Sequence, residues 1–109
     1  MLPAVERAHI DSAKVRDYLL SPVHPVGRFK AVVFQALGYK PEEWETLRDD
    51  LLALARTTEA VPGQASTFGQ KYEVGGTLRG PNGREAKFTS VWLVPADGGA
   101  PKFITAFPG

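Results

Sequence analysis

Apolar residues in the first half of the chain recur at intervals of three and four positions, which is typical of helices that bury one face. Pro22 and Gly38 interrupt this pattern, because proline cannot continue a helix and glycine favours the left-handed conformation that ends one. We therefore expect about three helices within residues 11–57. They run from Asp11 or Ser12 to Pro22, from Pro25 to Leu37, and from Pro41 to Thr57.

In the second half the period changes to two, the spacing of a strand with one buried face. Small and polar residues at about 58–69 precede this region and predict a loop. In the sheet part, about residues 70–107, the turn at 80–83 joins two strands, and a last strand follows from Lys102 to Phe107. The strand from about Glu85 to Val94 contains an unbroken apolar run at 91–94, which predicts an inner strand covered on both faces.

Together these elements predict an α+β fold. About three N-terminal helices would pack on one face of a C-terminal antiparallel sheet of three to four strands. A chain of 109 residues has room for one hydrophobic core, so we expect a single domain that spans residues 1–109.

Composition excludes several kinds of site. The chain has no cysteine and only two histidines, so thiolate or histidine-rich metal centres cannot form, and we expect no metal and no cofactor. The net charge of +1 does not give the positive field of a protein that coats DNA or binds a membrane surface, so neither partner is expected. The first thirty residues hold no apolar run of signal-peptide length, which indicates a cytoplasmic location.

The start of the second expected helix carries positive residues where acidic residues are usual. Arg28 and Lys30 lie in its first turn, and His24 lies at or near the N-cap. This arrangement favours a bound anion such as a phosphate, with a neutral His24 suited to act as a general base. The alternative is that both cations point into solvent and that His24 is only a cap.

A second group of cations flanks the predicted hairpin turn. Arg79 and Arg84 lie on either side of residues 80–83, where their guanidinium groups could hold a phosphate or simply be solvated. Thr105 on the last strand is a hydroxyl that could face a cleft at the sheet. Aromatic residues such as Tyr72 could stack on bases or form the core.

Two stretches resemble a family of small uncharacterised bacterial domains: YLLSPVHPVGRFKA at 18–31, and LRGPNGR at 78–84 together with the closing FITAFP at 103–108. More distantly, the order of the elements and the closing strand resemble the barnase, EndoU, colicin and RelE group of toxin ribonucleases. That resemblance implies a metal-independent endoribonuclease, in which a 2′-hydroxyl attacks the adjacent phosphate. It also implies an RNA substrate such as tRNA and neutralisation by a cognate antitoxin or immunity protein.

The same resemblance implies roles for individual residues. His24 would be a base or acid, Lys30 would stabilise the phosphate and Thr105 would position a substrate oxygen. Arg28, Arg79 and Arg84 are our candidates for phosphate and RNA binding. The resemblance is also compatible with a toxin domain delivered into a target cytoplasm.

Several alternatives remain open at this point. With one plausible histidine the second proton carrier is unidentified, and Lys30, Tyr72 or a substrate group could serve. Barnase-like chemistry with a glutamate would have to use Glu73 or Glu85. A non-catalytic protein-binding module of a toxin–antitoxin-like pair is the main alternative function. A sensor of phosphate esters would share the anion site at the second helix without needing a base.

Overall fold

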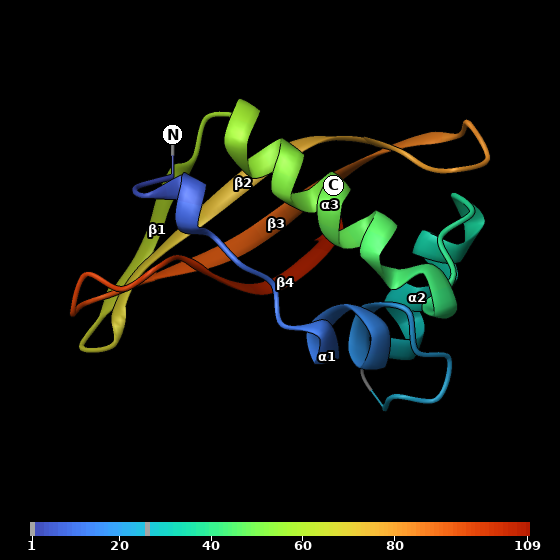
Figure 1. Cartoon of the computed structure of the whole chain (residues 1–109), viewed down its shortest axis with the longest axis horizontal. Coiled ribbons are helices and arrows are strands. Elements are labelled where there is room, and N and C mark those ends of the chain that lie inside the picture. Colours follow the sequence, from blue (N-terminus) through green and yellow to red (C-terminus); the bar gives the residue numbers. More distant parts are fainter. Residues whose placement is uncertain (1, 26) are drawn as a thin grey trace.

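The computed structural model describes residues 2–25 and 27–109, and it shows helices in the N-terminal half followed by an antiparallel sheet (Figure 1). Val26, which belongs to the expected second helix and to the resembling stretch, lies outside the described residues. The α-helices are α1 (Ser12–Lys14), α2 (Gly27–Ala36) and α3 (Trp44–Thr57). The shorter helical turns are η1 (Val5–Arg7), η2 (Val15–Leu19) and η3 (Pro41–Glu43).

Four strands form one antiparallel sheet in chain order, β1-β2-β3-β4. They are β1 (Val61–Ser66), β2 (Gly69–Arg79), β3 (Glu85–Pro95) and β4 (Lys102–Pro108). The long β2–β3 hairpin pairs without interruption from Gly69 opposite Pro95 to Arg79 opposite Glu85. The β3–β4 pairing shifts register between Val91 and Trp92, so Thr105 lies opposite Val91 while Phe103 lies opposite Trp92.

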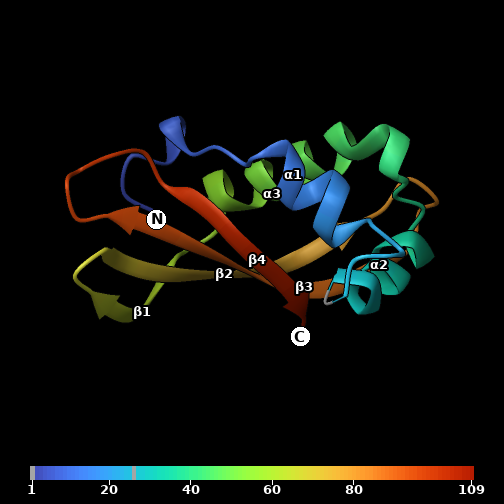
Figure 2. The ribbon, with the colours of Figure 1, turned by 90° about the horizontal axis from the view of Figure 1, so that it is seen from below.

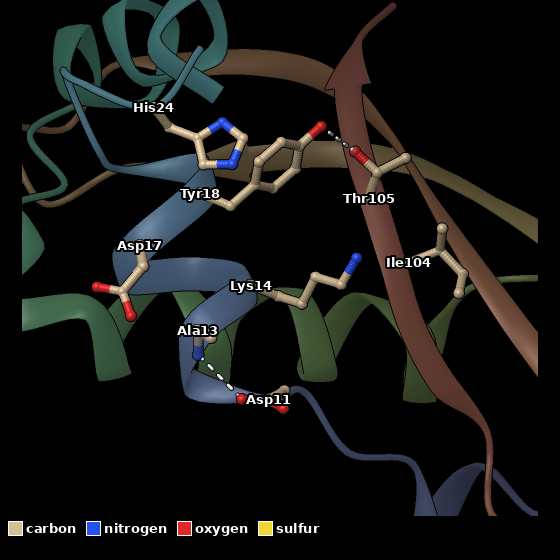
Figure 3. Close-up of a pocket in the computed structure, with 8 residues that line it drawn as sticks. All are labelled: Asp11, Ala13, Lys14, Asp17, Tyr18, His24, Ile104 and Thr105. Atoms are coloured by element: carbon tan, nitrogen blue, oxygen red, sulfur yellow. Dashed lines mark hydrogen bonds between the residues drawn. The ribbon is translucent and has the colours of Figure 1, made fainter. Parts of the chain in front are cut away.

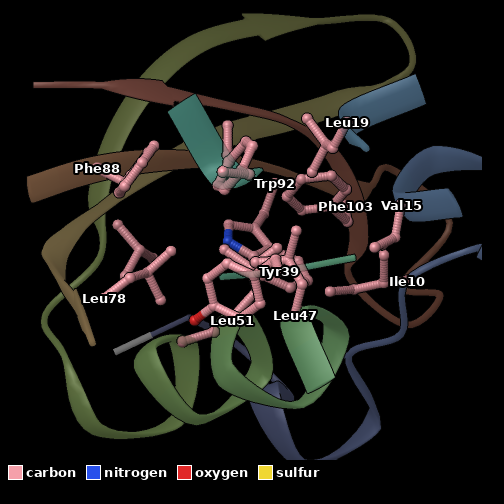
Figure 4. Close-up of a cluster of buried hydrophobic side chains, with 14 of the residues drawn as sticks. Ile10, Val15, Leu19, Tyr39, Leu47, Leu51, Leu78, Phe88, Trp92 and Phe103 are labelled. Carbon is pink, nitrogen blue, oxygen red and sulfur yellow. The ribbon is translucent and has the colours of Figure 1, made fainter. Parts of the chain in front are cut away.

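The hydrophobic core lies between α3 and the sheet, and the segment from α1 to η2 closes one side of it (Figure 4). Leu47, Leu51 and Ala55 on α3 recur at intervals of four and are fully buried, as an amphipathic helix requires. Trp92 on β3 is also fully buried, and its indole Nε1 donates to Ser90 Oγ at 2.9 Å. Because Ser90 Oγ in turn donates to the Val74 carbonyl, the buried polar groups satisfy one another.

The predicted architecture of three helices packed on one face of the sheet is wrong in this form. The structure is an α+β arrangement in which α1 and α3 lie on one side of the sheet, while α2 lies at its end, beside β3 and β4 (Figure 2). The first helix is also not a continuous α-helix. After α1 it widens to a π-helical turn, in which Leu20 N donates to the Val15 carbonyl five residues earlier at 2.9 Å.

The predicted loop at 58–69 is also corrected, because β1 occupies residues 61–66. Every residue of β1 is exposed and the strand contains Pro62 and Gly63, so it shows neither alternation nor the residue types of a buried strand. A register shift between Pro62 and Ala65 interrupts its pairing with β2. A strand without a buried face leaves no hydrophobic pattern to detect.

The strand predicted to be covered on both faces has one buried face. β3 is an inner strand, and Phe88, Ser90 and Trp92 are buried, but the alternate residues Val91 and Leu93 are only partly buried. The apolar run at 91–94 therefore serves both faces of β3: Trp92 and Val94 pack in or against the core, while Val91 and Leu93 lie on the opposite, partly exposed face.

Helix α2 is fixed at both ends by close approaches of glycine backbone. A Cβ atom on Gly27 would lie 1.9 Å from the Tyr18 carbonyl oxygen, and one on Gly80 would lie 2.0 Å from the Leu37 carbonyl oxygen. Only glycine allows contacts this close. Between these ends Phe34 stacks on Phe88 of β3, with ring centroids 4.7 Å apart. Within the described residues, no helix is both long and apolar enough to cross a lipid bilayer.

Candidate active site

A cleft of about 730 Å³ lies between the α1–η2 segment and β4 (Figure 3). Helical residues line one wall, strand residues line the other, and His24 from the loop before α2 closes one end. The lining residues are Asp11, Ala13, Lys14, Asp17, Tyr18, His24, Ile104 and Thr105. Two of the residues that the sequence singled out, His24 and Thr105, thus lie in one cleft although 81 positions separate them in the chain.

Three polar side chains from three elements meet at the end of this cleft. Lys30 Nζ on α2 donates to Thr105 Oγ1 on β4 at 2.6 Å and to the Tyr18 hydroxyl on η2 at 2.9 Å. The Tyr18 hydroxyl and Thr105 Oγ1 are themselves 3.3 Å apart (Figure 3). We call Tyr18, Lys30 and Thr105 the polar cluster. Lys30 and Thr105, which the sequence analysis named separately, lie together in it, beside a phenol that was not expected there.

Positive charge surrounds the phenol of the polar cluster. The Lys30 ammonium lies 5.2 Å from the centre of the Tyr18 ring, and the Lys14 ammonium lies 5.8 Å from it. Partial burial raises the pKa of Tyr18, but the hydrogen bonds from Lys30 and Thr105 and the charges of both lysines together outweigh it. The net pKa of Tyr18 lies below the ordinary value of tyrosine.

The two acidic side chains of the cleft are engaged outside the polar cluster. Asp11 Oδ1 caps α1 by accepting from Ala13 N at 3.0 Å. Asp17 accepts two hydrogen bonds from the neighbouring Arg16, which holds the pKa of Asp17 below its usual range. Lys14 and Lys30 therefore set the local charge around Tyr18, which suits an anionic ligand.

His24 has a defined structural task at the start of α2. Its Nδ1 accepts a hydrogen bond from Gly27 N at 3.0 Å, and its carbonyl accepts one from Arg28 N at 3.1 Å. These two N–H groups are therefore engaged within the chain, and the cation of this region that reaches the polar cluster is Lys30. The His24 ring also meets the Tyr18 ring edge-on, with centroids 5.0 Å apart and planes at 81°.

Local sequence explains why these side chains converge. In the π-helical turn the neighbours Tyr18 and Leu19 have different environments: the Leu19 side chain is fully buried, while the Tyr18 side chain lines the cleft. The contact of Gly27 with the Tyr18 carbonyl then brings α2 against η2, so that Lys30, one turn after Gly27, reaches the Tyr18 hydroxyl. Thr105 follows the register shift in the β3–β4 pairing.

A smaller hollow of about 290 Å³ adjoins the cleft along β4 and shares Asp11, Lys14 and Ile104 with it. It adds two basic side chains, His9 and Lys102. The N-terminal segment forms its wall, because His9 pairs with the start of β4 through backbone hydrogen bonds to Pro101 and Phe103. Cationic side chains thus follow β4 away from the polar cluster.

The three predicted arginine sites do not join the polar cluster. Arg28 is exposed, with its guanidinium 4.8 Å from the centre of the Phe29 ring. Arg79 lines a separate hollow between α3 and β2, and the exposed Arg84 lies at the hairpin turn, where Asn82 Oδ1 accepts from its backbone N at 3.0 Å. Their assignment to RNA binding remains a prediction.

Sequence reasoning did not name Tyr18 or Lys14 as site residues, and it left the second proton carrier open between Lys30, Tyr72 and a substrate group. Tyr72 packs against the core, and neither Glu73 nor Glu85 lines the cleft. Tyr18 fits the apolar spacing of the first predicted helix, in which a tyrosine is easily taken for core. A signal was present, because Lys14 and Tyr18 are four residues apart and residues at that spacing share one face of a helix.

The described residues offer few neighbouring metal ligands. Over residues 2–25 and 27–109, no group of three or more His, Asp or Glu side chains gathers closely enough to hold a metal ion. The lining of the cleft offers a ligand the Lys14 ammonium and the hydroxyls of Tyr18 and Thr105, and the Lys30 ammonium is hydrogen-bonded to both hydroxyls.

Comparison with known proteins places the chain in a family. It matches the model of the Domain of unknown function (DUF6883) over residues 1–109, and it therefore belongs to that family. No curated protein matches the chain. The expected membership of an uncharacterised domain family is thus confirmed.

A solved structure shares the fold. A chain in the "contact-dependent growth inhibition toxin - immunity protein complex from Klebsiella pneumoniae 342" superposes with a TM-score of 0.71 and 19% sequence identity. The match covers 92% of this chain and 98% of that chain. At this identity the similarity shows the fold alone. The finer resemblance to barnase, EndoU, colicin and RelE stays a prediction.

Proposed function

We propose that this member of the DUF6883 family is a toxin-type endoribonuclease that cleaves RNA without a metal ion, through attack of a 2′-hydroxyl on the adjacent phosphate. The observation that carries the proposal is the polar cluster, in which an ammonium, a phenol and a hydroxyl meet within 3.3 Å beside a cleft. The fold shared with a chain of a toxin–immunity complex supports the toxin class.

The cleft offers what this reaction requires. Attack of the 2′-oxygen places extra negative charge on the phosphate oxygens, and fixed cations stabilise that charge. Lys30 uses two of its three N–H groups within the polar cluster, so the third can donate to a phosphate oxygen. Lys14 lies on the opposite wall, and the Thr105 hydroxyl can orient a substrate oxygen.

Neutralisation by a protein partner belongs to the same proposal. Phe29 and Val32 lie three residues apart on α2 and are 67% and 69% exposed, and Val23 in the preceding loop is 83% exposed. Exposed apolar residues grouped in this way are typical of protein-binding surfaces. A partner bound there would lie close to His24 at the end of the cleft.

The same exposed apolar residues favour the second candidate, a non-catalytic binding module of a toxin–antitoxin-like pair. The two functions differ in one respect. The module would bind its partner through Phe29 and Val32 and would leave RNA intact, whereas the nuclease depends on the hydroxyl of Thr105.

The test incubates the purified protein with total RNA and with tRNA in EDTA, beside the variants Thr105→Val and Thr89→Val. Both variants remove a strand hydroxyl and keep its shape, but Thr89 Oγ1 donates to the Gly109 carbonyl and lies outside the cleft. A hydrogen bond to a charged group contributes about 1.5–3 kcal/mol, so Thr105→Val should slow cleavage by roughly 10- to 150-fold. Thr89→Val should cleave like the parent.

Two results would contradict the proposal. Intact RNA after long incubation with the parent protein would favour the binding module. Equal loss of activity in both threonine variants would show that the strand, and not the Thr105 hydroxyl, carries the effect.

A further inference from the structure

We propose that Tyr18 is the group that takes the proton from the attacking 2′-hydroxyl, and that His24 positions Tyr18 and does not transfer protons. This inference rests on the proposed function and identifies the proton carrier that the sequence left unassigned. It starts from the position of the Tyr18 hydroxyl, which contacts both Lys30 and Thr105 at the end of the cleft.

The hydrogen bonds of the polar cluster suit a phenol that becomes ionised. Lys30 Nζ carries only donors, so at 2.9 Å the Tyr18 oxygen is its acceptor. A negative charge on the Tyr18 oxygen would strengthen the hydrogen bond that it accepts from Lys30. Because the Lys30–Thr105 bond of 2.6 Å anchors the ammonium independently, Lys30 would keep its place when Tyr18 loses or gains a proton.

The groups that face Tyr18 come from four segments of the chain. Lys30 lies on α2, Lys14 on α1, His24 in the preceding loop and Thr105 on β4. Asp11 and Asp17 line the same cleft, but they are held by Ala13 N and by Arg16. The lysines and hydrogen bonds together lower the pKa of Tyr18 in spite of its partial burial, so its phenolate forms at lower pH than that of free tyrosine.

His24 is poorly placed to carry the proton itself. A neutral imidazole has one nitrogen lone pair, and at Nδ1 this lone pair accepts the hydrogen bond from Gly27 N. Protonation of Nδ1 would break the contact that begins α2. The edge of the ring instead packs against Tyr18 and limits the orientations of the phenol.

The reaction step balances with the groups of the polar cluster. The Tyr18 phenolate takes the 2′-hydroxyl proton while the 2′-oxygen forms a bond to phosphorus and the bond from phosphorus to the 5′-oxygen breaks. The Lys30 ammonium gives a proton to the departing 5′-oxygen. A phenol and a neutral amine remain, and proton transfer along their hydrogen bond restores the phenolate and the ammonium.

The experiment measures kcat/KM for RNA cleavage against pH in three proteins: the parent, Tyr18→Phe and His24→Asn. Tyr18→Phe keeps the ring but removes the proton carrier, so we expect a loss of roughly 10²- to 10⁴-fold and no increase in rate toward alkaline pH. Asparagine can accept the Gly27 N–H but has no ring to hold Tyr18 and cannot act as a base. His24→Asn should therefore lower kcat/KM by roughly 3- to 30-fold and keep the alkaline increase in rate of the parent, because the proton carrier is still present.

Two further measurements control for folding. Replacement of Tyr18 by 3-fluorotyrosine keeps the hydroxyl and lowers its pKa, so the alkaline increase in rate should move to lower pH. Spectrophotometric titration of the chain's three tyrosines should show an early step that is missing in Tyr18→Phe. Tyr39 cannot supply that step, because burial and its hydrogen bond to Asp50 raise its pKa.

The outcomes separate this inference from the proposed function. If the parent cleaves RNA and Tyr18→Phe cleaves equally well with the same pH profile, Tyr18 is not the proton carrier although the protein is a nuclease. If His24→Asn abolishes cleavage in a folded protein, the assignment of the two residues is overturned. If the parent cleaves no RNA, the proposed function fails and this inference fails with it.

Discussion

The two ends of α2 carry similar local sequence signals, and the structure uses them for different purposes. At the N-terminal end, Gly27 lets α2 approach η2, and Lys30 thereby reaches Tyr18 and Thr105. The result is a polar cluster beside a cleft, in which side chains from three elements are hydrogen-bonded to one another.

At the C-terminal end, the β2–β3 turn caps the helix. Asn82 N donates to the Leu37 carbonyl at 3.2 Å, and Asn82 Nδ2 donates to the Ala36 carbonyl at 2.9 Å. Gly80 lies against the backbone of Leu37, and Arg84 is left exposed. Glycine, proline and cationic residues mark both ends, but only at the N-terminal end do functional groups of different elements converge.

The largest difference between the two ends of α2 should appear in the rate of RNA cleavage. Lys30→Met keeps the aliphatic stem and removes the ammonium from the polar cluster, so cleavage of RNA should fall by roughly 10²- to 10³-fold. Arg84→Met removes a cation from the hairpin end and should leave the rate within about twofold. Initial rates on one RNA at matched protein concentration measure both, and equal losses would place the active site elsewhere.

The next effect concerns the packing of α2 against η2. Gly27→Ala adds a Cβ that would lie 1.9 Å from the Tyr18 carbonyl oxygen, so the free energy of unfolding should fall by about 1–3 kcal/mol. Gly75→Ala is the matched control, because a Cβ there meets nothing within 4 Å. Urea unfolding followed by circular dichroism compares the two, and a neutral Gly27→Ala would contradict the close approach.

A smaller loss of stability is expected at the other end of the helix. Asn82→Ala removes the side-chain hydrogen bonds to the Ala36 carbonyl and the Arg84 backbone N, which should lower the free energy of unfolding by about 1 kcal/mol. RNA cleavage measured well below the melting temperature should not change. A large loss of activity with normal stability would show that the hairpin takes part in function and does not only support the fold.

The smallest effect is expected along β4. Lys102 lies in the hollow next to the cleft, so Lys102→Ala should raise KM a few-fold without changing kcat, through the loss of one phosphate contact. The logarithmic dependence of 1/KM on salt should become shallower by about 0.7 for single-stranded RNA. An unchanged salt dependence would show that the RNA does not follow β4.

The sequence predicted those features of the fold that follow from one buried face. The stripe of α3 and the period of two in the sheet part were readable because burial imposes a period on the residues, whereas the apolar run at 91–94 wrongly indicated a strand covered on both faces. β1 was missed because none of its residues is buried, and the π-helical turn was missed because its hydrogen-bond pattern has no composition of its own.

For the candidate site, the sequence identified Lys30 and Thr105, and their contact 75 positions apart arises only in the folded chain. His24 was recognised as unusual, but whether its nitrogen serves a helix or a substrate depends on the position of the Gly27 N–H. Tyr18 was missed because its apolar ring fits the helical stripe while its hydroxyl leaves the core. A periodic pattern reports the side on which a residue lies, and it does not report what the end of a long side chain reaches.

The most direct test of the central claim is the chemistry of the RNA ends. An RNA cut by the parent protein in EDTA is analysed by mass spectrometry, beside the same RNA with a 2′-O-methyl group at the cleavage position. Attack by the 2′-hydroxyl at the polar cluster predicts an upstream fragment that ends in a 2′,3′-cyclic phosphate, and no cleavage of the methylated RNA. An upstream fragment with a 3′-hydroxyl, or cleavage of the methylated RNA at the same position, would contradict the account.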